Sequence, residues 1–311
     1  MSVLKLEIRV VKVAILTAIR LLAVTILYFG AFAVVSGALL STAPERPEPA
    51  NANTTLLALF LVSLINAAVW TYVILRSRWT GWKLVLTVFF VFYGVGTLLT
   101  QIETAYFVTR LPPGMLPRLF LAGIIMAAVF APLAVLILGK AKSETKGTSG
   151  HARLQTPANV WIAKLSLIVI AYLLIYFTFG YFIAWRNPTV RAYYGGSDPD
   201  SFIVHITSLL QNEPLLFLLQ IVRALFWTAI AVPVIKMMKG DWWESGLAVA
   251  LLFAVTSSLL LLPNPLMPTE VRMAHFVETA TSNFLFGWLV VLILRRVSPL
   301  GNSTSEVDSH D

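Results

Sequence analysis

The sequence predicts an all-α integral membrane protein, a polytopic bundle of about eight transmembrane helices. Of its 311 residues, 58% are hydrophobic and only 12% are charged, and the mean hydropathy is +0.81. Soluble domains are roughly a quarter charged, so this composition indicates that lipid surrounds much of the chain. The apolar residues are also gathered into runs of about 20, the length that a helix needs to cross a hydrocarbon core roughly 30 Å thick.

Eight runs have this length, and each is continuous rather than alternating in hydrophobicity. Strands of a membrane barrel alternate and are only about 10 residues long, so helices explain the runs better. A helix also satisfies its own backbone hydrogen bonds in lipid, which irregular chain does not. The eight predicted spans are residues 21–41, 55–75, 84–103, 119–139, 165–185, 214–235, 245–263 and 274–294.

The Lys and Arg residues between the spans predict the orientation of the chain. Sixteen of them lie in the N-terminal segment, the C-terminal tail and every second loop, six lie in the other loops, and Arg223 lies within a span. Loops with excess positive charge stay in the cytoplasm, so both termini are expected there, in the cytoplasmic membrane if the source is bacterial. Residues 1–20 are basic and partly amphipathic, which favours a helix on the inner surface over a cleavable signal peptide.

The two halves of the chain resemble each other. Residues 26–32 echo residues 174–180, and residues 73–82 echo residues 234–243, at offsets that run from 148 to 161. This predicts two four-helix halves, residues 21–139 and 165–294, joined by a cytoplasmic linker at 140–164 and followed by a cytoplasmic tail at 295–311. Repeated halves of equal orientation imply a pseudo-two-fold axis along the membrane normal. The alternative is that apolar helices resemble one another by composition alone.

Composition also narrows the chemistry. The absence of Cys excludes disulfides, zinc–thiolate sites and iron–sulfur clusters. The net charge of +8 comes from residues that flank the spans, which indicates contact with the lipid bilayer rather than with nucleic acid. Haem held inside a bundle needs histidines in several spans, and of the four histidines only His275 lies at a span end. We therefore predict no cofactor, and the oligomeric state is left open.

Charged residues inside a span are costly and are functional candidates by default. Arg223 lies nine residues after Pro214, about 13 Å into the membrane at 1.5 Å per residue, and Gln220 lies one turn away on the same face. An Arg at this depth needs an acid, water or an anionic ligand. Glu278 and Glu103 are the acids available, and Arg223 and Glu278 are expected to reach similar depth. Two alternatives stay open, an ion pair that locks helices together and a site that handles a ligand or protons.

The last span carries a polar stripe that descends into the bilayer. His275, Glu278, Thr279 and Ser282 share one helical face. Polar residues are concentrated in the outer halves of the third, sixth, seventh and eighth spans, and Asn66 lies near the middle of the second. This predicts a polar cavity open to the extracytoplasmic side, with Arg223 near its floor and Glu103, His275 and Glu278 near its rim. The alternative for the hydroxyl groups is ordinary contact between helices.

The loop after the fifth span is rich in turn residues, cations and aromatic rings. It contains Arg186, Arg191, Tyr193 and Tyr194, and helical spacing of apolar residues then predicts a short interfacial helix over 202–210 with His205 on its flank. The loop is expected to act either as a lid whose Arg and Tyr side chains meet an anionic head group, or as an anchored connection.

Three classes of function remain open. Transport or binding of a small anionic or lipid-like ligand comes first, with Arg223 as a fixed charge and Glu278 and His275 as proton-handling groups. The second class is a membrane-embedded enzyme with a His/Glu acid–base site. No metal is predicted, although His275, Glu278 and Glu103 are an alternative ligand set within this class. The third class is an assembly or sensory partner without chemistry of its own.

Overall fold

A computed structural model describes residues 3–40, 52–108, 111–142, 157–197, 200–263 and 267–295 of the chain. Within these ranges every regular element is helical, and the β contact is a single bridge between Ser77 and Met238. Eight helices are long and apolar enough to cross a membrane. The all-α, multi-pass membrane fold predicted from the sequence is therefore confirmed.

The spans of the structure coincide with the predicted runs and extend a few residues beyond most of their ends. Helices continue past the hydrocarbon core because their own hydrogen bonds satisfy the backbone on both sides of it. The spans are Val10–Leu39, Ala52–Leu75, Gly81–Phe107, Met115–Ile137, Ala158–Trp185, Pro214–Met237, Trp242–Leu261 and Thr269–Arg295.

Three of the eight spans change their helix type part-way. The third span consists of α3 (Gly81–Tyr93), a π-helical turn η1 (Gly94–Leu98) and α4 (Leu99–Phe107). The fifth consists of α6 (Ala158–Phe179) and the π-helical η2 (Gly180–Trp185), and the seventh of α10 (Trp242–Val255) and the 3₁₀-helical η3 (Thr256–Leu261). The uninterrupted spans are α1 (Val3–Leu40), α2 (Ala52–Leu75), α5 (Met115–Ile137), α9 (Pro214–Met237) and α11 (Thr269–Arg295). Two short helices, α7 (Pro188–Tyr194) and α8 (Phe202–Asn212), lie between the fifth and sixth spans.

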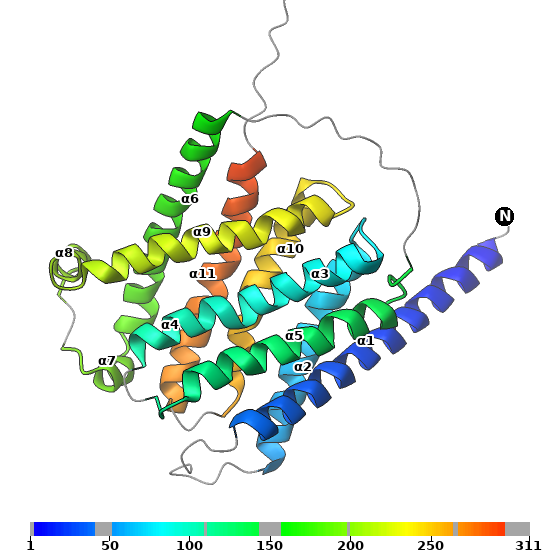
Figure 1. The fold of residues 1–311 in the computed structure, drawn as a ribbon, viewed down its shortest axis with the longest axis horizontal. Helices are drawn as coiled ribbons and strands as arrows, with labels where there is room; N and C mark the ends of the chain where they lie inside the picture. Colours follow the sequence, from blue (N-terminus) through cyan, green and yellow to red (C-terminus); the bar gives the residue numbers. More distant parts are fainter. Residues whose placement is uncertain are drawn as a thin grey trace, which may run out of the picture.

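The helices of the two halves make corresponding contacts (Figure 1). In the first half α1 packs against α2 and α5, and α3 packs against α5. In the second half α6 packs against α9 and α11, and α10 packs against α11. The halves meet where α9 contacts the third span and where α10 and η3 contact α2. These contacts are the ones that a parallel repeat would produce, but the duplication itself stays a prediction.

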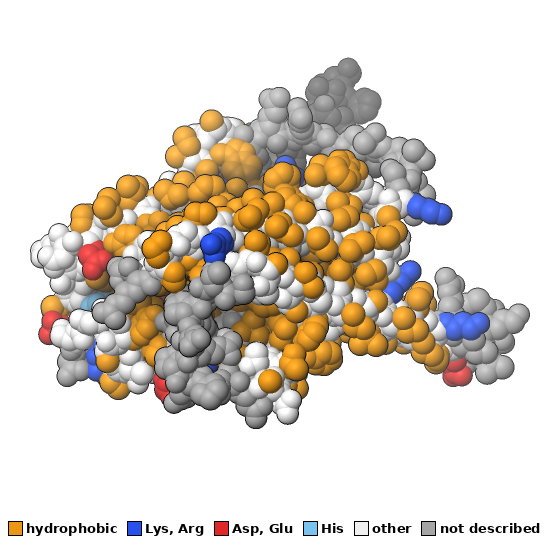
Figure 2. Space-filling model, turned by 60° about the horizontal axis from the view of Figure 1, so that its bottom comes forward, with side chains coloured by type: hydrophobic (Ala, Val, Ile, Leu, Met, Phe, Trp, Pro, Cys, Tyr) orange, Lys and Arg blue, Asp and Glu red, His pale blue; other side chains and the backbone are white. Residues whose placement is uncertain are grey.

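Aromatic side chains fill the centre of each half, and apolar side chains cover the outside. Trp70 and Phe130 pack at 6.0 Å between ring centres in the first half, and Trp227 and Phe253 at 4.3 Å in the second. Figure 2 shows one outer face on which hydrophobic side chains predominate and charged side chains are few. A soluble protein would not expose so much apolar surface, whereas a membrane protein meets lipid there.

The first helix differs from the prediction. Residues 1–20 were expected to form a separate surface helix, but α1 runs without interruption from Val3 to Leu40. Its 38 residues extend for about 57 Å at 1.5 Å per residue, and its N-terminal part projects beyond the bundle (Figure 1). No Gly or Pro lies near residue 20 to end a helix, which explains the continuity.

Some predictions fall on parts of the chain outside the described residues. These are most of the linker, at 143–156, and the tail from 296 to 311.

Candidate functional site

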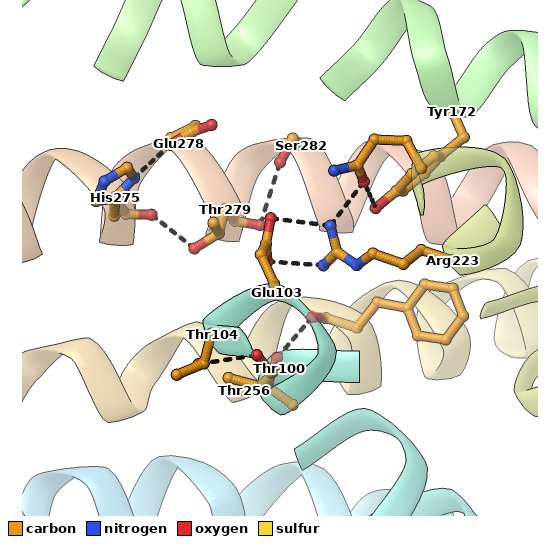
Figure 3. A network of polar contacts seen from close by, with 12 residues as sticks. Thr100, Glu103, Thr104, Tyr172, Arg223, Thr256, His275, Glu278, Thr279 and Ser282 are labelled. Carbon is orange, nitrogen blue, oxygen red and sulfur yellow. Dashed lines mark hydrogen bonds and ion pairs between the residues drawn. The ribbon is translucent and has the colours of Figure 1, made fainter. Parts of the chain in front are cut away.

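Most of the charged and polar residues predicted within the spans form two groups of side-chain contacts (Figure 3). In the first group Arg223 on α9 faces Glu103 on α4. Arg223 Nη1 lies 2.9 Å from Glu103 Oε1, and Nη2 lies 2.8 Å from Oε2. Such two-point pairing of guanidinium and carboxylate is the strongest geometry for an ion pair in proteins.

This pairing settles which acid meets Arg223. Arg223 and Glu278 were expected to reach similar depth, but among the described residues the acid paired with Arg223 is Glu103. Glu278 instead contacts His275, three residues earlier on its own helix. Glu278 contacts His275 rather than Arg223 because residues three apart on a helix lie side by side before any tertiary contact forms.

Two further side chains hold the guanidinium in place. Nη1 of Arg223 also donates to Oε1 of Gln220 at 2.8 Å, and the Tyr172 hydroxyl on α6 donates to the same oxygen at 3.3 Å. Arg223 is 5% exposed and Gln220 is fully buried. Two donors of this pair, Nε of Arg223 and Nε2 of Gln220, have no acceptor among the described residues. A buried N–H without an acceptor is costly, so this end of the site has more donors than acceptors.

The π-helical turn η1 positions Glu103. An α-helix that continued from α3 would present residue 103 on a different face, because each π turn inserts one extra residue into the helix. Small residues make room for η1: a Cβ at Gly123 on α5 would overlap the side chain of Thr97, and a Cβ at Gly94 would lie 2.6 Å from Cδ1 of Ile230. Close contacts with α5 and α9 thus stabilise the turn, and the turn places Glu103 on the helix face that meets Arg223.

The second group joins α11 to α7. Nδ1 of His275 lies 2.7 Å from Oε2 of Glu278, and the Tyr194 hydroxyl lies 3.2 Å from Nε2 of the same imidazole. Burial raises the pKa of the Tyr194 hydroxyl, so the hydroxyl stays protonated at neutral pH. The two contacts together hold the imidazole ring between Tyr194 and Glu278 and fix its orientation. The start of η2 packs beside this group, since a Cβ at Gly180 would be in ordinary van der Waals contact with Oε1 of Glu278, at 3.4 Å.

Helix α7, which carries Tyr194, was predicted as loop. Its start follows from local chemistry: the side chain of Asn187 accepts from the backbone N–H of Thr189 at 2.9 Å, and Pro188 occupies the first helical position. Its end follows as well, because Gly195 adopts φ +74°, the left-handed conformation that terminates helices. The Asn-Pro signal was present in the sequence, but the seven-residue helix has no apolar periodicity long enough to detect.

The predicted hydroxyl and amide groups have more modest roles. Thr279 donates to the carbonyl of His275 at 2.6 Å and Ser282 to that of Thr279 at 3.4 Å, so both bond their own helix. Asn66 donates to Ser258 in η3 at 2.9 Å and to Val62 O at 2.9 Å. It therefore links α2 to the seventh span, apart from the two groups above.

The loop candidates divide between the site and its surroundings. Tyr194 belongs to the second group, and the ring of Tyr193 packs edge-on against it at 4.8 Å. Arg191 donates to the carbonyl of Trp185 at 2.9 Å, while Arg186 is exposed. The predicted helix after the loop is present as α8, and its His205 packs beside Tyr181 and Trp185 at 5.4 and 5.6 Å.

Sequence reasoning missed two features of the polar contacts. Tyr172 was not singled out, because nothing in the sequence separates it from the other tyrosines of its span. The pair between Arg76, in the turn after α2, and Glu244 on α10 was also missed. Among the described residues no group of three His, Cys, Asp or Glu side chains is placed to hold a metal ion. The alternative ligand set of His275, Glu278 and Glu103 is thus not assembled. The imidazole of His275 contacts the carboxylate of Glu278, whereas the carboxylate of Glu103 contacts Arg223.

Comparison with protein-family models, curated proteins and solved structures finds no match for the chain. The function therefore has to be argued from the geometry of the two polar groups.

Proposed function

We propose that this protein binds a small anionic or lipid-like ligand at Arg223 and carries it across the membrane. The observation that supports the proposal is a permanently charged guanidinium buried in a membrane span, with Gln220 beside it and with N–H donors to spare. An Arg does not lose its proton in a protein, so its charge is a fixed attraction for a carboxylate or a phosphate.

The surroundings of Arg223 favour a ligand with an apolar part. Tyr172, whose hydroxyl shares the Gln220 oxygen with the guanidinium, packs against Phe286 of α11 at 4.8 Å. Phe177 of α6 and Phe217 of α9 pack against each other at 4.5 Å on the same two helices that carry Tyr172 and Arg223. Ligand sites combine such apolar walls with a few polar groups that fix orientation. A carboxylate or phosphate head at Arg223 with a hydrophobic tail among these rings meets both requirements.

Transport by purified protein in phosphatidylcholine liposomes tests this proposal. One arm measures uptake of radiolabelled benzoate, and the other measures movement of fluorescent phosphatidylglycerol between leaflets. For the substrate that wild type transports, Arg223→Gln is expected to reduce the transport rate at least tenfold. Arg76→Gln breaks an ion pair far along the chain from the site and is expected to leave the rate unchanged. Equal transport by wild type and Arg223→Gln in both arms would contradict the proposal.

A second candidate function is a membrane-embedded acid–base enzyme. The chain of contacts from Tyr194 through His275 to Glu278 favours it. A carboxylate that orients one imidazole nitrogen prepares the other to act as a general base, and here a substrate hydroxyl would take the place of the Tyr194 hydroxyl at Nε2. Wild-type and His275→Ala protein incubated in nanodiscs of mixed phospholipids would be compared by lipid mass spectrometry. A product that forms only with wild type supports an enzyme, and identical lipid profiles count against it.

A further inference from the structure

We infer that Glu103 occupies the place of the ligand's oxyanion on Arg223, and that it takes up a proton when the ligand replaces it. This inference rests on the proposed function and specifies its chemistry: the ligand presents a carboxylate or phosphodiester, and one proton binds with each anion.

The first argument is the number of donors around Arg223. A guanidinium offers five N–H groups, and the carboxylate of Glu103 receives bonds from Nη1 and Nη2 only. Nε of Arg223 and Nε2 of Gln220 remain buried without an acceptor among the described residues. An oxyanion brought in by a ligand would accept from these two donors as well as from Nη1 and Nη2. It would therefore give an acceptor to more of the buried N–H groups than Glu103 does.

The second argument is the difference between the two sides of the ion pair. Arg223 and Gln220 are buried and are held by Tyr172. The side chain of Glu103 is 30% exposed, and its helix α4 buries only Leu99 among its nine residues. Helix α4 also follows the π turn η1, an irregularity that often accompanies functional movement. Glu103 is therefore the partner that can withdraw, and Arg223 is the partner that stays.

The third argument is charge balance inside the membrane. Arg223 and Glu103 together are neutral, and an added anion would leave one uncompensated negative charge where charge is expensive. Protonation of Glu103 restores neutrality. Glu278 does not take up this compensating proton, because its carboxylate contacts His275 rather than Arg223. The titratable groups that face Glu103 from the neighbouring helices are Arg223 on α9, Tyr172 and Tyr176 on α6, Tyr194 on α7 and His275 on α11.

The exchange is balanced in atoms and charge. The carboxylate of Glu103 accepts a proton from a hydronium ion or a buffer acid of the solution, which is left as water or as the buffer's conjugate base. The resulting carboxylic acid releases its two bonds from Arg223. The oxyanion enters from the solution or the lipid and accepts those bonds, so one proton and one negative charge enter together. Arg223 keeps its charge throughout, and the reverse sequence releases the ligand.

The inference is tested by binding to purified full-length protein between pH 6 and 8.5, with two probes whose own charge is constant in that range. Benzoate is titrated against protein in detergent, and phosphatidylglycerol is titrated in phosphatidylcholine nanodiscs. The arm that shows binding distinguishes a free anion from a lipid head group. For wild type, uptake of one proton per anion predicts that Kd rises about tenfold for each unit by which the pH is raised across this interval.

The decisive variant is Glu103→Gln, which resembles the protonated acid. It is expected to bind the active probe at least tenfold more tightly than wild type at pH 8 and to lose the pH dependence, while Arg223→Gln binds neither probe. Proton uptake by wild type on ligand addition, measured with a pH dye in weak buffer, keeps the test valid if Glu103→Gln does not fold.

The outcomes separate the inference from the proposed function. Binding that needs Arg223 but is independent of pH, or that weakens in Glu103→Gln, overturns the exchange and leaves the function standing. Binding of neither probe by wild type overturns both.

Discussion

Ser77 and Met238 face each other in an antiparallel bridge that joins the turn after α2 to the turn after α9. The backbone N–H of Arg78 donates to Met237 at 2.6 Å, and that of Lys239 donates to Arg76 at 3.0 Å. The two turns lie in residues 73–82 and 234–243, the segments whose sequences echo each other. When those segments are aligned, Ser77 and Met238 are equivalent positions. The bond from Arg78 to Met237 is then equivalent to the bond from Lys239 to Arg76. Equivalent segments meet in this way when a pseudo-two-fold axis passes between them.

The bridge predicts a disulfide in the variant Ser77→Cys/Met238→Cys. The hydrogen bonds of this bridge flank the facing pair, and such a pair has Cα atoms about 4.5 Å apart, within the range that a disulfide spans. The protein contains no Cys, so the variant has no competing thiol. Non-reducing mass spectrometry of tryptic peptides is expected to find the two turns linked after mild oxidation. Single-cysteine variants serve as controls, and linkage absent from the double variant would contradict the contact between the halves.

The spans could be predicted from the sequence because burial in lipid selects residues by composition, which each run shows locally. The same information does not determine how helices pack. The first helix is an example: the basic and partly amphipathic character of residues 1–20 predicted a surface helix, whereas the lack of a Gly or Pro near residue 20 lets α1 continue to Leu40. Contacts between distant turns, such as Arg76 with Glu244, depend on the arrangement of whole helices and leave no local signal.

The charged residues of the two polar groups could be predicted from the sequence, whereas their pairing could not. Arg223, Glu103, His275 and Glu278 stood out because charge in a span is rare. Which carboxylate meets Arg223 depends on the π turn η1, and that turn is created by tertiary contacts at Gly94 and Gly123 rather than by its own sequence.

The contact between α10 and α11 predicts a large effect of adding one methyl group. A Cβ at Gly287 would lie 2.6 Å from Cα of Ala250, which is backbone and does not move aside. Gly287→Ala is expected to destabilise the protein by about 1–3 kcal/mol, the usual cost of overpacking, and to lower the thermal midpoint in detergent. Gly30→Ala in α1 is the matched control, because nothing lies within 4 Å of a Cβ there. A midpoint in Gly287→Ala equal to that of the control would show that the helices are not so close.

The ion pair of Arg223 and Glu103 predicts strong coupling in a double-mutant cycle. Glu103→Gln leaves a buried guanidinium with a weaker partner, so it is expected to cost about 2–4 kcal/mol. Arg223→Gln is expected to cost less, because Glu103 is 30% exposed and water replaces part of the interaction. The double variant is expected to be more stable than the sum of the single effects implies. Thermal unfolding of all four proteins measures the coupling, and strictly additive effects would contradict a direct pair.

His205 predicts a pH dependence of stability at the α8 end of the molecule. Burial beside Tyr181 and Trp185 lowers the pKa of His205 below its ordinary value, and the carboxylate of Asp200 opposes this shift. The unfolded chain then binds the proton more readily than the folded protein, so stability contributed by neutral His205 is present above pH ~6.5 and declines as the pH falls below that value.

The measurement is the thermal midpoint of wild type and of His205→Gln at pH 7.5 and at pH 5.5. Both proteins share every other titrating group. The contribution of His205 is therefore the difference between the two proteins in how far the thermal midpoint falls from pH 7.5 to pH 5.5. Wild type is expected to lose more stability than the variant over this interval, because glutamine takes up no proton against the Tyr181 and Trp185 rings. An equal fall in both proteins, or a larger fall in His205→Gln, would mean that α8 does not hold the imidazole against those rings in its neutral form.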